Sequence, residues 1–203
     1  MGYRGPFQEN LRVCVEGLSL ARGGRVLFEG LSFNATPGAM VEIRGPNGSG
    51  KTSLLRAIAG FLQPRVGAIR LEGAEEPALA LHYIGHRNGL KPSADARAHL
   101  RYWAGLLGGE TETARVLALV GLERAAELPA RALSQGQAQR LALARLMLAP
   151  RPVWLMDEPA AALDAGGREL LQGLIEAHCA QGGVVLAAVH DGLGVAARET
   201  VML

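Results

Sequence analysis

The segment Gly45–Thr52 reads Gly-Pro-Asn-Gly-Ser-Gly-Lys-Thr and constrains the fold more than any other part of the chain. It fits the pattern G-x-x-x-x-G-K-[ST] at every fixed position. A short apolar run at 40–43 precedes it, and a helical pattern at 52–59 follows it. Glycines let the backbone curl so that successive N–H groups face one concavity, which suits the oxygens of a polyphosphate. The sequence therefore predicts a strand, a phosphate-binding loop and a helix in succession.

Two side chains of this loop complete the predicted nucleotide site. Lys51 adds a positive charge at the outer phosphates, and the Thr52 hydroxyl is placed for Mg²⁺. The helix that follows directs the positive end of its dipole at the phosphates. The alternative is a glycine-rich turn before a helix, but the preceding strand favours the nucleotide site. The residues expected to bind the nucleotide are Gly45, Pro46, Asn47, Gly48, Ser49, Gly50, Lys51 and Thr52.

Length and composition exclude several other classes of protein. A chain of 203 residues with 49% hydrophobic residues can bury the core of one large domain. The net charge of +2 provides no global field that would recruit nucleic acid. No apolar run approaches the roughly 20 residues that span a bilayer. We therefore expect a single cytosolic domain that does not insert into a membrane, with its two cysteines as reduced thiols.

The apolar pattern predicts an α/β fold of the P-loop type. Its core is a mostly parallel sheet flanked by helices, with an antiparallel β layer before it and a helical subdomain inserted into it. We expect the β layer and phosphate-loop core at 10–90, the helical subdomain at about 91–150 and the rest of the core at 151–203. Predicted strands lie at 11–20, 26–27, 31–33, 40–43, 68–71, 79–84, 153–156, 184–189 and 200–203. The main predicted helices lie at 52–59, through 100–107, and at 113–120, 133–148 and 165–180.

Acidic residues follow the apolar run 153–156, which is typical of a strand buried in a parallel sheet. Asp157 and Glu158 come directly after it, and adjacent carboxylates at such a strand end are costly unless they meet a cation. We expect Asp157 to hold Mg²⁺ through water. Glu158 is expected to act as the general base for a water that attacks the γ-phosphate.

The histidines differ in their expected roles. His190 ends the strand at 184–189 and could hydrogen-bond the γ-phosphate, although a lone histidine is more often structural. We expect His82 and His99 on the surface. His178 lies near a helix end, where a cation suits the dipole. His86 lies in a loop bounded by glycines.

A helix start at Leu133-Ser134-Gln135-Gly136-Gln137 carries an S-x-x-Q capping box. Together with the phosphate loop, the Asp-Glu-Pro strand end, the sequence Ala162-Leu163-Asp164 and His190, it resembles the ATP-binding-cassette (ABC) ATPases along nearly the whole chain. The resemblance implies a head-to-tail homodimer that holds two ATP molecules at its interface. In it, Ser134, Gln135, Gly136 and Gln137 bind the γ-phosphate held by the other subunit.

Two positions depart from the pattern of this family. Where the family usually places a glutamine that contacts Mg²⁺ and the attacking water, this chain has His86 with Arg87 beside it. Either side chain could replace the glutamine, and we expect His86 at the metal. Where the family stacks an aromatic residue on adenine, the chain has Ala21-Arg22-Gly23-Gly24. We expect the Arg22 guanidinium to stack on the base, which predicts loose base selectivity.

The loop Gly85-His86-Arg87-Asn88-Gly89-Leu90-Lys91 looks like that of the haem-exporter ATPases of cytochrome c maturation, the CcmA family. This resemblance implies a separate membrane permease of the CcmB type, a further membrane partner of the CcmC type, and a peripheral position on the inner face of the plasma membrane. We expect residues 86–103 to couple ATP hydrolysis to that permease. The alternatives are an ABC transporter ATPase for another cargo, a soluble ABC-type ATPase, and a nucleotide-binding module without catalysis.

Overall fold

The computed structural model describes residues 7–8, 10–108 and 112–203. Its described residues form two compact units. The sheet unit comprises residues 7–85, 151–159 and 174–203, and the helical unit comprises residues 86–150 and 160–173. The helical unit thus includes a second stretch, 160–173, beyond the predicted range of about 91–150.

The first layer of the sheet unit is a three-stranded antiparallel sheet with the order β2-β1-β4. The predicted antiparallel layer is therefore confirmed. The prediction of two strands at 26–27 and 31–33 is wrong, because β2 is continuous from Arg25 to Ala35. Gly30 lies within it at a φ of 68°, and the β1–β2 register shifts between Leu18 and Leu20. A glycine at positive φ absorbs this bulge, so the strand bends without ending. The bounds are β1 Arg12–Arg22, β2 Arg25–Ala35 and β4 Val66–Glu72.

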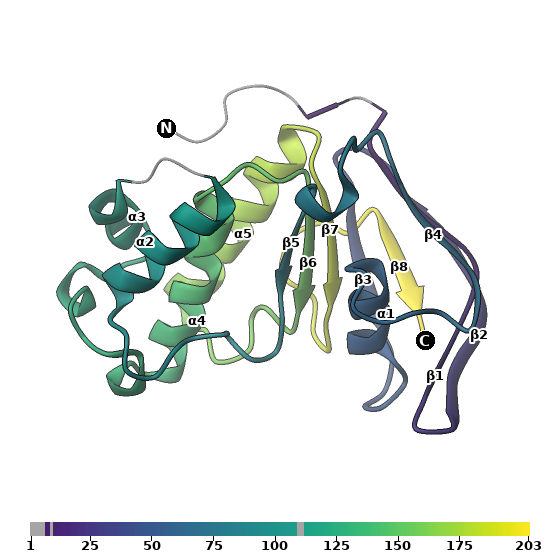
Figure 1. The fold of residues 1–203 in the computed structure, drawn as a ribbon, viewed down its shortest axis with the longest axis horizontal. Helices are drawn as coiled ribbons and strands as arrows, with labels where there is room; N and C mark the ends of the chain where they lie inside the picture. Colours follow the sequence, from purple (N-terminus) through teal and green to yellow (C-terminus); the bar gives the residue numbers. More distant parts are fainter. Residues whose placement is uncertain (1–6, 9, 109–111) are drawn as a thin grey trace. The chain divides into compact units, whose positions relative to one another are not determined.

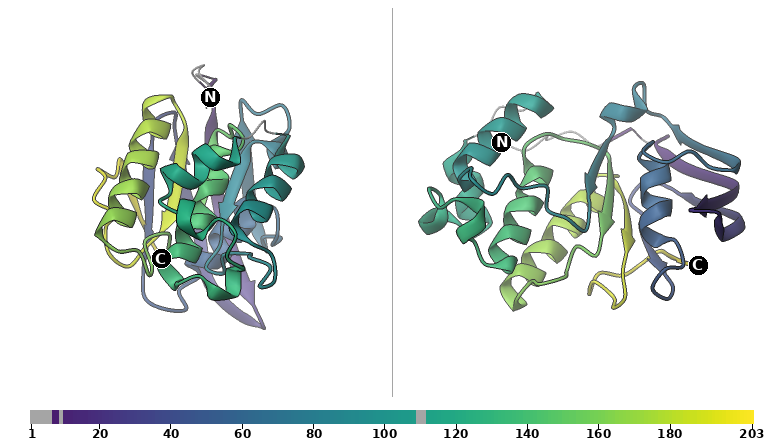
Figure 2. Two further views of the ribbon diagram at one scale, coloured as in Figure 1. Left: turned by 90° about the vertical axis from the view of Figure 1, so that its left-hand side faces the viewer. Right: turned by 60° about the horizontal axis from the view of Figure 1, so that its bottom comes forward.

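The second layer is a five-stranded parallel sheet with the order β5-β6-β7-β3-β8 (Figure 1). Every residue of β6 and β7 is buried, as the continuous apolar runs predicted. Helix α1, Lys51–Ile58, lies between the two sheets (Figure 2). Its Leu54 and Leu55 are fully buried in the core that the two sheets share, and such side chains each contribute ~1.5–3 kcal/mol. The bounds are β3 Met40–Arg44, β5 Leu81–Ile84, β6 Val153–Asp157, β7 Val184–Ala188 and β8 Glu199–Met202.

The helical unit packs α2, α3, α4 and the first half of α5 around its own core. Asp95 caps α2 by accepting a hydrogen bond from the Ala98 N–H at 2.6 Å. Leu100, Leu117 and Leu141 are fully buried in this core. The helix predicted to reach residue 148 is α-helical only to 143. The bounds are α2 Ala96–Leu107, α3 Thr113–Leu119, α4 Gln135–Leu143 and α5 Ala165–Ala180, with 3₁₀ turns η1 Pro77–Leu79, η2 Glu123–Ala125, η3 Ala130–Ala132 and η4 Ala144–Met147.

Three histidines are buried, although His82 and His99 were predicted to lie on the surface. His82, His99 and His178 are each 5% exposed. The rings of His178 and Trp154 stack at 3.7 Å, and burial lowers the pKa of His178 to about 4. The prediction of a cation at the end of α5 is therefore wrong, because a neutral imidazole fits an apolar site better than a charged one.

None of the described helices combines the length and the apolar character that crossing a bilayer requires.

Candidate nucleotide-binding site

The phosphate loop joins β3 to α1 in the sheet unit. Gly50 precedes α1 at a φ of 115°, and a Cβ atom there would lie 3.0 Å from the Phe28 ring, so only glycine fits without strain. No side chain caps the start of α1. The first N–H groups of the helix are therefore left for an anion.

Lys51 is held within the same loop. Its Nζ donates to the carbonyl oxygens of Gly45 at 2.8 Å and Pro46 at 3.2 Å, and the residue is 8% exposed. Neither partner is an anion, so the positive charge of the ammonium is oriented but not neutralised. The loop thus provides a fixed cation beside an uncapped helix start.

Thr52 and Asp157 lie together although 105 positions separate them in the sequence. The Thr52 hydroxyl donates to the Asp157 carboxylate, with distances of 3.1 Å to Oδ1 and 2.9 Å to Oδ2. Asp157 ends β6 and is 3% exposed. Mg²⁺ prefers oxygen ligands and usually takes only one or two carboxylates, with water and phosphate supplying the rest. The convergence of a hydroxyl and a buried carboxylate beside the phosphate loop fits that ion.

Glu158 and His190 follow adjacent strands. His190 Nε2 lies 3.4 Å from Glu158 Oε1, and their side chains are 50% and 24% exposed respectively. Glu158 has a φ of 53° and donates its N–H to the Ala188 carbonyl at 3.0 Å. A left-handed conformation is unfavourable for a non-glycine residue and marks functional sites when the fold enforces it. The sheet therefore presents a carboxylate and an imidazole together at its carboxyl edge.

A buried carboxylate that sequence reasoning missed supports the segment after His190. Glu42, in β3, is 4% exposed and its Oε1 accepts a hydrogen bond from the Leu193 N–H at 3.3 Å. Arg44 Nε donates to Glu42 Oε2 at 2.8 Å. Residues two apart in a strand point to the same face, so the spacing of Glu42 and Arg44 was a sequence signal that could have predicted this pair.

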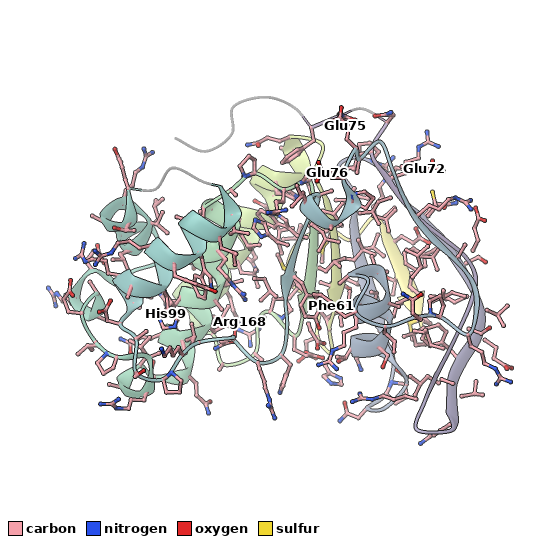
Figure 3. All side chains as sticks on the ribbon, in the orientation of Figure 1. Phe61, Glu72, Glu75, Glu76, His99 and Arg168 are labelled. Carbon is pink, nitrogen blue, oxygen red and sulfur yellow. The ribbon has the colours of Figure 1, made fainter. Side chains whose placement is uncertain are left out.

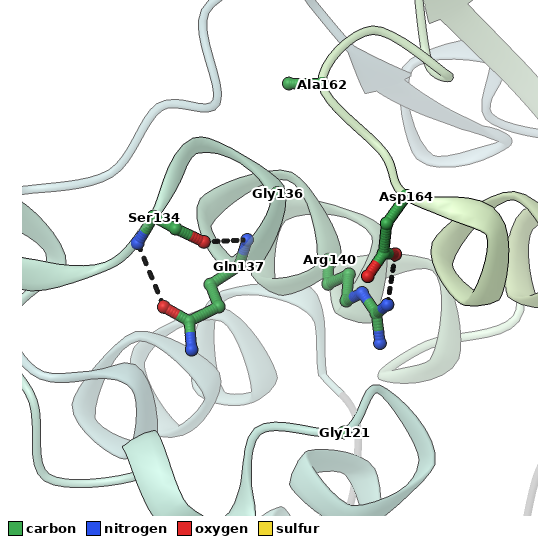
Figure 4. Close-up of a pocket in the computed structure, with 7 residues that line it drawn as sticks. All are labelled: Gly121, Ser134, Gly136, Gln137, Arg140, Ala162 and Asp164. Atoms are coloured by element: carbon green, nitrogen blue, oxygen red, sulfur yellow. Dashed lines mark hydrogen bonds and ion pairs between the residues drawn. The ribbon is translucent and has the colours of Figure 1, made fainter.

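The helical unit carries the second predicted anion site at the start of α4 (Figure 4). The Gln137 N–H donates to Ser134 Oγ at 3.1 Å, and the Ser134 N–H donates to Gln137 Oε1 at 2.9 Å. The predicted capping box is therefore present. A pocket of about 490 Å³ opens beside it, lined by Gly121, Ser134, Gly136, Gln137, Arg140, Ala162 and Asp164.

Arg140 and Gly121 belong to this pocket but were not predicted from the sequence. Arg140 donates to Asp164, and the Gly167 N–H donates to Asp164 Oδ1 at 2.8 Å. The bond from Arg140 holds the pKa of Asp164 below its usual value. Arg140 lies four residues after Gly136, so helical spacing could have placed it on the same face.

The described structure brings the predicted residues together in two groups. In the sheet unit, Thr52 at the end of the phosphate loop bonds to Asp157, and the next residue, Glu158, lies beside His190. Ser134, Gln135, Gly136 and Gln137 form the start of α4 in the helical unit. Arg22 is exposed at the end of β1, and His86 is exposed at the start of the helical unit. Their roles at adenine and at the metal remain predictions.

A phosphate loop, a carboxylate pair at the end of β6 and the capped start of α4 define the ATP-binding subunit of an ABC transporter. The family pattern described as ABC transporter matches residues 28–161. The fold is similar to that of a putative ABC transporter ATP-binding protein from Pyrococcus furiosus, with a TM-score of 0.81, 21% identity and coverage of 95% of this chain and 97% of that chain.

Curated relatives define the family more narrowly. The chain is 49% identical over 187 residues to the cytochrome c biogenesis ATP-binding export protein CcmA of Rhodopseudomonas palustris strain BisB5, covering 90% of this chain and 94% of the relative. It is 50% identical over 182 residues to CcmA of Bradyrhizobium diazoefficiens, covering 88% and 91%. The chain belongs to the CcmA family of ABC transporter ATPases. The resemblance inferred from the motifs is confirmed, and the chain is an ATP-binding protein and an ATPase of the ABC type.

Proposed function

We propose that this chain is the ATP-hydrolysing subunit of the haem exporter complex of cytochrome c maturation. The observation that carries the proposal is the identity of about one half to proteins named as cytochrome c biogenesis export proteins, along nine-tenths of the chain. The loop at 85–91, which departs from the wider ABC pattern at His86, supports the same assignment. In this role the chain couples hydrolysis of MgATP to a separate membrane permease.

ATP binds in this proposal at Gly45–Thr52. The N–H groups at the start of α1 contact the phosphate oxygens, and Lys51 neutralises their charge. When bound, Mg²⁺ is held by the Thr52 hydroxyl and by Asp157, and it neutralises charge on the outer phosphates. Arg22 stacks on the base, and His86 takes the place of the usual glutamine beside the metal.

Glu158 is the proposed general base for hydrolysis. Its carboxylate accepts the proton of a water that attacks the γ-phosphate, and a positioned base contributes ~10²–10⁴-fold to the rate. His190, 3.4 Å from Glu158, binds the γ-phosphate from the neighbouring strand. The enforced backbone conformation of Glu158 supports this role.

A homodimer completes the site in this proposal. The start of α4, with Ser134 and the backbone around Gly136, binds the γ-phosphate carried by the phosphate loop of a second copy. Ser134 is exposed beside a pocket of the helical unit, which supports contact with a second chain. Each chain then supplies half of two sites.

The proposed membrane partners are a permease of the CcmB type and a further partner of the CcmC type. The chain lies peripherally on the inner face of the plasma membrane, and residues 86–103 form its docking region. Gly89 and Lys91 are exposed in that region, which supports contact with a partner.

Affinity purification of the chain from its native membranes, followed by mass spectrometry, tests this assignment. We expect recovery of a cytochrome c maturation permease. Recovery of another permease would retain the ATPase and discard the cargo, whereas purely soluble partners would discard the transporter. Wild-type recovery of the permease after changes at Gly89, Leu90 and Lys91 would move the docking region elsewhere.

A further inference from the structure

A buried histidine anchors the exposed segment Gly89–Lys91 to the helical unit. His99 lies in the first turn of α2 and is 5% exposed (Figure 3). Its Nε2 lies 2.9 Å from the backbone nitrogen of Lys91, and its Nδ1 lies 2.8 Å from the carbonyl oxygen of Asp95. Both ring nitrogens are therefore engaged with the backbone on either side of residues 92–94.

The partners of the ring determine its protonation. A backbone N–H can only donate, so Nε2 must accept the hydrogen bond from Lys91 and carries no proton. A carbonyl can only accept, so Nδ1 carries the proton and donates to Asp95. The neutral Nδ1–H tautomer thus links the two segments, and Asp95 in turn caps α2 through the Ala98 N–H. The anchor is fixed to a helix end and not to a flexible loop.

Aromatic and cationic neighbours hold this ring in place. The His99 and Trp103 rings lie 5.3 Å apart at an interplanar angle of 52°. The Arg145 guanidinium lies 4.9 Å from the centroid of Trp103 on its face, and a Cβ atom added to Gly89 would lie 3.9 Å from Arg145 Nη1. The Arg145 guanidinium over the Trp103 ring restricts the orientation of Trp103. Because His99 packs against Trp103, its orientation is restricted as well. The cluster thus bonds the segment at Lys91 and lies near its other end at Gly89.

The segment Gly89–Lys91 and its anchor His99 differ in their exposure to solvent. Gly89 and Lys91 are exposed and Leu90 is partly exposed, whereas His99 and Trp103 are buried. A partner that docks on this surface meets the segment and not the imidazole. Any effect of His99 on docking therefore passes through the conformation of the segment.

We propose that His99 is a positioning residue that holds Gly89–Lys91 in the conformation that engages the membrane permease. This inference rests on the proposed function for the identity of the partner. It assigns a role to a side chain that neither binds nucleotide nor reaches the partner.

Two variants separate the hydrogen bond from the packing. His99→Phe keeps a planar ring against Trp103 but cannot accept the bond from Lys91. His99→Gln loses the ring but can place an amide oxygen near the position of Nε2. For His99→Phe we expect basal ATP hydrolysis by the isolated chain within about twofold of wild type. We also expect about fivefold weaker stimulation by the permease, because one hydrogen bond is worth ~1 kcal/mol. His99→Gln should recover most of the stimulation.

Three measurements on the full chain test the proposal. The first is hydrogen exchange at the Lys91 amide of the isolated chain, which should be faster in His99→Phe. The second is the amount of permease recovered with each variant from native membranes, and the third is ATP hydrolysis with and without that permease. Unchanged exchange at Lys91, an equal loss of basal and stimulated hydrolysis, or failure of His99→Gln to recover stimulation would each overturn the proposal.

The same measurements distinguish failure of the anchor from failure of the proposed function. If wild type recovers no permease, the proposed function fails and the docking role of His99 fails with it. If wild type recovers the permease and the His99→Phe chain recovers it and is stimulated equally, only the positioning role fails.

Discussion

The two ends of the five-stranded sheet carry similar polar side chains in opposite surroundings. At the carboxyl end, Asp157 is buried but bonded to Thr52, while Glu158 and His190 lie 3.4 Å apart with partly exposed side chains. At the amino end, His178 stacks on Trp154 and is 5% exposed. Histidine therefore faces solvent and a carboxylate at one end of the sheet, and aromatic carbon at the other.

The difference shows that the reactive side chains lie at the carboxyl end of the parallel sheet, whereas the polar side chains at the amino end serve packing. Ligands bind beyond the carboxyl ends of parallel strands, where the phosphate loop and neighbouring strand ends meet. Groups there must remain ionised or able to exchange protons. Burial at the amino end instead lowers the pKa of His178 to about 4, so this imidazole remains neutral near pH 7 and serves as a flat packing element.

Glu158→Gln is expected to have the largest effect on activity, because it changes the chemistry of the carboxyl end and leaves the packing of the amino end intact. The amide keeps the shape of the side chain but cannot accept the proton, so the rate of ATP hydrolysis should fall ~10²–10⁴-fold. ATP binding and the free energy of unfolding should change little. The measurement is steady-state hydrolysis beside equilibrium binding of labelled ATP, with size-exclusion chromatography to detect a trapped dimer.

A matched control for this experiment is Glu176→Gln, at an exposed position of α5. It makes the same chemical change away from the carboxyl end and should leave hydrolysis unaltered. Hydrolysis by Glu158→Gln at the wild-type rate would remove Glu158 from the role of base.

Acidification should act on the amino end of the sheet through His178. Its folded-state pKa of about 4 lies below the ordinary value of 6.5. The neutral ring therefore contributes fully above pH 6.5, and this contribution is lost as the pH falls toward 4. A shift of that size corresponds to about 3 kcal/mol. Urea unfolding of wild type and His178→Phe between pH 7 and 4 measures it as the difference between the two proteins.

Carboxylates titrate in both proteins, so their effect cancels in that difference. We expect the stability of wild type relative to His178→Phe to fall as the pH decreases. A difference that stayed constant from pH 7 to 4 would show that His178 titrates normally, and the contrast between the two ends would be lost.

Much of the carboxyl end could be predicted from the sequence because its elements are local patterns. The loop Gly45–Thr52, the apolar strand before Asp157 and the capping box at Ser134 each occupy a few consecutive residues. Chemical type and spacing are enough to identify them. The meeting of Thr52 with Asp157 followed from placing both at the same edge of a parallel sheet.

The amino end could not be predicted in the same way. The burial of His82 and His178 depends on which helix and strand cover them, and a single polar residue has no periodicity that reports this. The contact of Arg140 with Asp164 likewise joins α4 to the residue before α5, which lies 24 positions away in the sequence. The continuity of β2 through Gly30 depends on its pairing with β1, which local turn signals do not reveal.

His190→Ala should have a smaller effect than Glu158→Gln on the same end. His190 is proposed to bind the γ-phosphate and not to take the proton, so its loss should lower hydrolysis about tenfold, at the upper range of one hydrogen bond. Because the side chain is half exposed, stability should be nearly unchanged. Hydrolysis and thermal unfolding measured on one preparation test both statements. An unfolding temperature that fell as far as for a core substitution would show that His190 is a packing residue like His178.

Trp154→Phe should have the smallest effect, and its sign tests the character of the amino end. Trp154 is 5% exposed, and its Nε1 is buried without a hydrogen-bond partner among the described residues. Phenylalanine loses volume against His178, which destabilises the fold, but it also removes an unsatisfied N–H, which costs ~1–3 kcal/mol when buried. The two terms oppose each other, so we expect a change in unfolding free energy below ~1 kcal/mol and unaltered hydrolysis. Denaturant unfolding measures the first and an ATPase assay the second. A loss of several kcal/mol would mean that the indole N–H has a partner, and a loss of hydrolysis would mean that the two ends of the sheet are coupled.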